Sequence, residues 1–147
     1  MTGKQAGSTL LEALVVLAIM GIALGIGAMY LRPIESPLKS GATLVEGLCR
    51  QARTSAIATT SAYRVRPGTA HMLLAEQAAS CSETTWEVDN ASKTQLPQGV
   101  SVKSTSWAVC FSSRGISTDN QEIHLQHSQF GEIGVEVLLG GTTRVIE

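Results

Sequence analysis

The chain has 147 residues, with 11 basic and 12 acidic side chains, a formal net charge of −1 and only 4% aromatic residues. These totals fit one small domain plus an anchor. They exclude a chain dominated by a basic tail or an acidic run, and they give no indication of a nucleic-acid partner. The abundance of Gly, Ser and Thr suits a β-rich extracytoplasmic domain with many turns.

The most informative segment covers residues 8–31, with the sequence STLLEALVVLAIMGIALGIGAMYL. The run from Ala13 to Leu31 is uncharged, and as a helix it is long enough to cross a hydrocarbon core of about 30 Å. Glu12 stands at the start of this run, where burying a carboxylate is costly and indicates a functional site. We expect its partner to be a cation from another chain, such as the amine that a cut after Gly7 would create.

The order Gly7, Ser8, then Thr-Leu-Leu-Glu and an unbroken apolar run resembles the cleavage and assembly signal of type IV pilins and type II secretion pseudopilins. In that family a prepilin peptidase cuts after the Gly and N-methylates the new first residue. The resemblance therefore implies cleavage between Gly7 and Ser8, N-methylation of Ser8, and an assembly role for Glu12, the fifth residue after the cut. The family usually has Phe where this chain has Ser8.

The predicted organisation has four parts: a leader peptide at 1–7, a transmembrane and assembly helix at 8–32, a kink and amphipathic helix at 33–60, and a β-rich globular domain at 61–147. An ordinary secretory signal is disfavoured, because its cleavage site follows the apolar run rather than preceding it. A plain single-pass anchor explains the length of the segment but not Glu12.

A break and a second helix are predicted after the anchor. Pro33 and Pro37 bracket the break, because proline removes a backbone donor and disfavours helix in the residue before it. From about Leu38 to Thr60, apolar residues recur at spacings of three and four, which predicts an amphipathic helix with one buried stripe.

The remaining sequence is patterned as strands and turns, and with the two helices it predicts an α+β fold in which a long N-terminal helix packs on an antiparallel β-sheet domain. A hairpin is expected to turn at Pro67-Gly68, and a second turn is expected at Gly140-Gly141. A polar loop is expected at 90–93. The predicted strands are 61–67, 69–76, 84–88, 101–107, 109–111, 122–127, 133–139 and 142–146.

Three later features resemble the GspH/FimT branch of pseudopilins and minor pilins. They are the helix end at 52–58, the segment Val-Cys-Phe-Ser-Ser-Arg-Gly at 109–115, and the closing hairpin at 133–145. The closing segment departs from the Gly-Arg-x-Arg pattern of that branch, because Thr142 and Thr143 separate Gly141 from Arg144. The resemblance implies a pilin-like fold and a minor subunit.

The chain has three cysteines. Cys81 and Cys110 both lie in the β-patterned region, and we predict that they form a disulfide, which an extracytoplasmic compartment permits. Cys49 lies in the predicted amphipathic helix and is expected to be a small buried hydrophobe.

No catalytic residue, metal site or cofactor is predicted. His124 and His127 would lie on opposite faces of a strand and are poor joint ligands, and His71 stands apart from them. The sequence has no nucleophile elbow, phosphate-binding loop or dinucleotide fingerprint. The class expected is a non-enzyme.

The resemblance implies assembly with other pilin or pseudopilin subunits, processing by a prepilin peptidase, contact with an inner-membrane assembly platform and membrane lipid, and a periplasmic C-terminal domain. The chain would enter a surface pilus or a secretion pseudopilus.

Two other functions remain open from the sequence. Some FimT-like minor pilins bind DNA through a basic C-terminal patch, and the candidates here are Arg144, Arg114 and Lys103. One arginine near the end of a mildly acidic chain is weak support, because DNA affinity depends on several cations. A membrane-anchored periplasmic binding domain would keep the anchor and would not need the cut at Gly7.

Overall fold

The computed structural model describes residues 10–30 and 36–146, and the chain divides into two compact units, 1–34 and 35–147. The predicted break around Pro33 lies outside the described residues. The first unit contains helix α1 (Leu10–Tyr30). Within the part of the chain that the structure describes, no helix combines the length and apolarity needed to cross a membrane.

Helix α2 (Pro37–Thr59) begins where proline predicts a helix start. The Ser36 hydroxyl accepts a hydrogen bond from the Lys39 amide at 3.3 Å, and Pro37 occupies the first turn, where its missing N–H costs nothing. The helix ends at Thr60, which adopts a left-handed conformation with φ of 54°. The amphipathic helix expected from about Leu38 to Thr60 is therefore confirmed.

Eight strands form two antiparallel four-stranded sheets. The first sheet has the order β3-β2-β1-β5, and the second has the order β4-β6-β7-β8. The strands are β1 (Ala62–Thr69), β2 (Met72–Ala78), β3 (Glu87–Gln95), β4 (Val100–Val102), β5 (Val109–Phe111), β6 (Gln121–His127), β7 (Gly131–Val137) and β8 (Thr143–Ile146).

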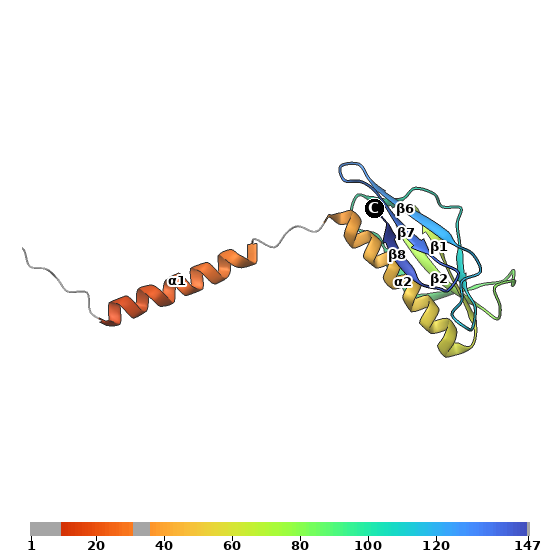
Figure 1. The fold of residues 1–147 in the computed structure, drawn as a ribbon, viewed down its shortest axis with the longest axis horizontal. Coiled ribbons are helices and arrows are strands. Elements are labelled where there is room, and N and C mark those ends of the chain that lie inside the picture. The colour runs from red at the N-terminus through yellow and green to blue at the C-terminus, as the bar shows by residue number, and fades with distance from the viewer. Residues whose placement is uncertain (1–9, 31–35, 147) are drawn as a thin grey trace, which may run out of the picture. The chain divides into compact units, whose positions relative to one another are not determined.

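The core of the second unit lies between α2 and both sheets. The buried stripe of α2 includes Val45, Cys49 and Ala56, each 0% exposed. It joins one cluster with inward residues of both sheets, such as Phe111 and Val135. Figure 1 shows α2 lying along the strands of this unit. Burial of this stripe fixes the two sheets on one helix, because apolar surface removed from water contributes roughly 25 cal/mol per Å².

Three predictions for the strands were wrong. The strand expected at 84–88 begins only at Glu87 and continues to Gln95 as β3. The polar loop expected at 90–93 lies inside β3, an edge strand that pairs with Met72–Gln77 across a bulge. Edge strands tolerate polar side chains because one side faces solvent. The strand expected at 101–107 ends at Val102. Beyond it, the Ser104 hydroxyl accepts from the Ser106 amide at 3.3 Å, which offers the backbone an alternative to ladder pairing.

The turn predicted at Pro67-Gly68 is displaced toward the C-terminus. Strand β1 continues through these residues with a register shift between Pro67 and Thr69, and the chain reverses at 70–71. Proline is tolerated here because β5 pairs only with Tyr63–Val65, so the missing N–H of Pro67 lies beyond that ladder.

Candidate functional sites

The predicted cleavage and methylation residues, Gly7 and Ser8, lie outside the described residues. Glu12 lies in the first turn of α1, where a carboxylate interacts favourably with the helix dipole. The large apolar side chains around it are exposed, from 49% at Val15 to 79% at Leu10. Over residues 10–23, this helix therefore exposes apolar side chains along its length.

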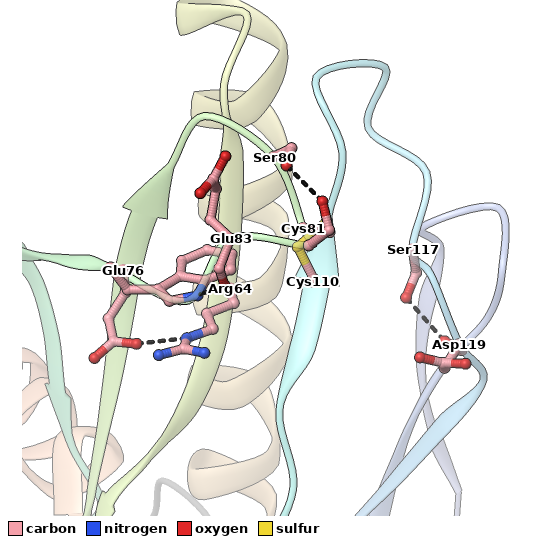
Figure 2. The surroundings of a disulfide bond; sticks show 10 residues. Arg64, Glu76, Ser80, Cys81, Glu83, Cys110, Ser117 and Asp119 are labelled. Atoms are coloured by element: carbon pink, nitrogen blue, oxygen red, sulfur yellow. Dashed lines mark hydrogen bonds and ion pairs between the residues drawn. A yellow bond between two sulfur atoms is a disulfide. The ribbon is translucent and has the colours of Figure 1, made fainter.

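The disulfide between Cys81 and Cys110 is confirmed (Figure 2). It joins the loop after β2 to strand β5, with the two Cα atoms 5.9 Å apart and a sequence separation of 29. Cys49 is a buried free thiol, as predicted. Burial, reinforced by the nearby Glu46 charge, raises the pKa of Cys49 to about 12, so this thiol stays neutral and unreactive.

A charged network lies next to the disulfide loop on the outer face of the first sheet. The Glu76 side chain is only 3% exposed and accepts from two arginines, Arg64 Nε at 2.6 Å and Arg66 Nη2 at 2.6 Å. The Arg64 guanidinium also stacks 4.2 Å from the centre of the Trp86 ring, which belongs to the disulfide loop. Figure 2 shows Arg64 reaching toward Glu76 beside this loop.

Sequence reasoning missed this network, although a signal was present. Arg64 and Arg66 alternate on one strand of the predicted hairpin and Glu76 lies on the other. The register pairs Arg64 directly with Glu76. Opposite charges facing each other across a ladder stabilise a sheet.

The network makes the free energy of unfolding decrease at acid pH. Hydrogen bonds from Arg66, and then from Arg64, lower the pKa of Glu76 below its usual 4.5. Because the pKa of Glu76 is lower in the folded state than in the unfolded state, folding favours the charged carboxylate. The contribution of Glu76 to the free energy of unfolding is therefore present above about pH 4.5, and it is lost as the pH falls through the lowered pKa of the folded state. We expect Glu76→Gln to lower the free energy of unfolding by about 1–2 kcal/mol at pH 7, because both arginines are partly exposed.

Urea unfolding at pH 7 and at pH 3 checks this prediction, and the difference between wild type and Glu76→Gln should shrink at pH 3. Glu132→Gln is the matched control, because Glu132 pairs with Lys103 at 2.9 Å but is 49% exposed. An equal loss in both variants at pH 7 would contradict the account.

The three candidates for DNA binding come from different elements, and two of them are paired with carboxylates. Lys103 pairs with Glu132 at 2.9 Å, and Arg144 pairs with Glu136 at 2.6 Å. Both pairs lie on the second sheet, whereas Arg114 lies in the turn after β5, which belongs to the first. Two of the three cations are therefore already neutralised by neighbouring carboxylates.

The histidines occupy separate environments. His71 Nδ1 lies 2.9 Å from the Val100 carbonyl oxygen, His124 Nε2 lies 3.3 Å from Glu122 Oε1, and the His127 ring contacts Phe130 edge-on. Among the residues described by the structure, no three His, Cys, Asp or Glu side chains are grouped so as to hold a metal ion.

The helix end at 52–58, the segment at 109–115 and the closing hairpin at 133–145 meet at one place, which we call the Arg53 cradle: Arg53 with the backbones of Gly115 and Gly141. A Cβ added to either glycine would lie 3.1 Å from Arg53 Nε. Both glycines have positive φ, 72° and 75°, which favours glycine at these turns. Arg53 Nη1 donates to the Gly141 carbonyl at 3.4 Å, while its buried Nε has no hydrogen-bond partner among the described residues.

Comparisons with known proteins agree with this architecture. Residues 2–28 match the family model of the prokaryotic N-terminal methylation motif. No curated protein matches the chain. The chain thus carries a prokaryotic N-terminal methylation motif ahead of an α+β domain, and the predicted pilin-like fold is confirmed by the solved structures that share it.

The solved structures that share this fold include the type IV minor pilin FimU of Pseudomonas aeruginosa strain PAO1. In one crystal form the TM-score is 0.57 at 15% identity, covering 75% of this chain and 88% of FimU. In a second crystal form the TM-score is 0.56 at 15% identity, covering 75% of this chain and 93% of FimU. At this identity the likeness establishes the fold.

Proposed function

We propose that the chain is a non-catalytic minor subunit of a type IV pilus or a type II secretion pseudopilus. The observation that carries this proposal is the combination of a methylation motif at residues 2–28 with the fold of a minor pilin. The expected partners are other pilin-type subunits, a prepilin peptidase, and an inner-membrane assembly platform.

Assembly follows from the chemistry of the N-terminal unit. Cleavage between Gly7 and Ser8 removes the leader and leaves a protonated, N-methylated amine on Ser8. The apolar segment 8–32 holds the subunit in the inner membrane, with the globular unit in the periplasm, and then packs among the same segments of other subunits. Glu12 pairs with the N-terminus of a neighbour, which brings two costly charges together and sets the register between subunits.

Fractionation of the native cells tests this proposal. We expect the chain to be recovered with sheared surface filaments or with the isolated pseudopilus, and to remain in the membrane fraction when the prepilin peptidase gene is deleted. Recovery with filaments from the deleted cells would contradict the proposal, and recovery only in membranes from both strains would favour the plain anchored domain.

DNA capture is a rival function that the charge pairs disfavour. Because Lys103 and Arg144 are each paired with a carboxylate, we expect the full-length protein in detergent to show no measurable affinity for duplex DNA even at low salt. Fluorescence anisotropy of a labelled duplex over a salt titration measures this. Binding that weakens with salt and is lost in Arg144→Gln would overturn the prediction.

A further inference from the structure

Among residues 36–146, the two arginines without a carboxylate partner belong to segments that meet. Six arginines fall within residues 36–146, and four of them are ion-paired: Arg50, Arg64, Arg66 and Arg144. The other two, Arg53 and Arg114, lie at the Arg53 cradle, since Arg114 directly precedes Gly115. Over the described ranges, neither has a carboxylate oxygen within 4.0 Å, so positive charge is left unneutralised at one place.

Three exposed aliphatic side chains lie on the segments that meet at the Arg53 cradle. Ile57 is 51% exposed, Ile116 is 49% exposed and Leu139 is 52% exposed. They come from α2, the β5–β6 loop and the β7–β8 turn. A Cβ at Gly115 would lie 2.7 Å from Ile57 Cδ1, and the Ser117 amide donates to the Leu139 carbonyl at 3.1 Å, so the three segments are in contact. We call these three residues with Arg53 and Arg114 the helix-end face.

We propose that the helix-end face binds a segment of a partner protein that presents a carboxylate flanked by aliphatic side chains. Arginine beside apolar side chains is the composition of interface centres that carry binding energy. The glycine backbones hold Arg53 in place, so little side-chain entropy is lost when a carboxylate binds.

The charge pattern selects this occupant over two others. A symmetric pair of copies would bring two Arg53–Arg114 pairs against each other, and like charges across an interface are unfavourable. A nucleic acid would favour several cations with aromatic stacking surfaces, whereas this face has two cations and aliphatic residues. The inference does not depend on the N-terminal unit or on the proposed assembly.

A random-peptide phage library panned against the full-length protein in detergent tests the proposal. We expect enriched peptides to share an Asp or Glu between aliphatic residues. Synthetic copies of these peptides should bind Arg114→Gln about tenfold more weakly than wild type. They should also bind Leu139→Ser more weakly.

Two matched controls keep the test specific. Arg50→Gln changes an exposed arginine on the same helix that is already paired with Glu46, and Leu44→Ser changes a 41% exposed aliphatic residue elsewhere on that helix. Both should bind within about twofold of wild type. Enrichment without an acidic residue, no enrichment, equal binding by Arg114→Gln, or displacement of the peptides by self-association or by duplex DNA would each overturn the proposal.

Discussion

Glu12→Leu is expected to leave the protein in the membrane but to abolish its recovery with filaments. The substitution removes the carboxylate that would meet a neighbour's N-terminal amine, and it makes the apolar segment longer. In hydrocarbon an uncompensated charge costs on the order of 3 kcal/mol, so the amine of the neighbour would be disfavoured in that position. Membrane fractionation and immunoblotting of sheared filaments measure the two effects separately.

Glu83→Leu is the matched control for this change. Glu83 is exposed in the globular unit, and the hydrogen bonds that the structure describes for it use its backbone: its N–H donates to the Ser80 carbonyl at 3.2 Å, and its carbonyl oxygen accepts from Trp86 Nε1 at 2.8 Å. This variant should reach filaments at the wild-type level. Recovery of Glu12→Leu at that same level would remove Glu12 from the assembly mechanism.

The double substitution Cys81→Ser and Cys110→Ser is expected to lower the free energy of unfolding by about 3–4 kcal/mol. A bridge that closes a loop of this length restricts the unfolded chain by roughly that amount in the chain-entropy account. The loop that carries Trp86 would also lose its tie to β5, which weakens the stacking on Arg64. Urea denaturation, with fluorescence of the tryptophans as the probe, measures the loss.

Reductant and thiol labelling provide the controls for the disulfide. Adding dithiothreitol should destabilise the wild type to the level of the double variant and leave that variant unchanged. Under those conditions iodoacetamide should label Cys81 and Cys110 in the native state, while Cys49 should react only after unfolding, since its pKa is raised to about 12. Labelling of native Cys49 in preference to the other two would contradict the assignment.

The helix and the core strands could be predicted because burial imposes a period on them. Helix α2 has its apolar residues at spacings of three and four, and its boundary at Pro37 follows from the chemistry of proline. Strands β3 and β4 could not be placed well. The residues of β3 are mostly polar, and its position is fixed by backbone pairing with β2, which leaves no hydrophobic pattern in the sequence.

The candidate site residues likewise include some that could be predicted from the sequence and some that could not. The disulfide and the buried Cys49 could be predicted from their positions in the β-patterned region and the helix. The sequence could not predict which cations remain without a carboxylate partner, because ion pairing depends on the strand register and on the conformation of the turns. Arg144 is neutralised by Glu136 on the neighbouring strand, whereas Arg53 is held between two glycines from turns 26 residues apart, positions 115 and 141.

The intact mass of the protein recovered from assembled filaments or pseudopili tests the central proposal most directly. The proposal predicts a chain that begins at Ser8, lacks residues 1–7, and carries one additional methyl group on its N-terminal nitrogen. A chain that retains the leader ahead of Ser8 would contradict it, because Glu12 would then have no neighbouring amine of this kind with which to pair.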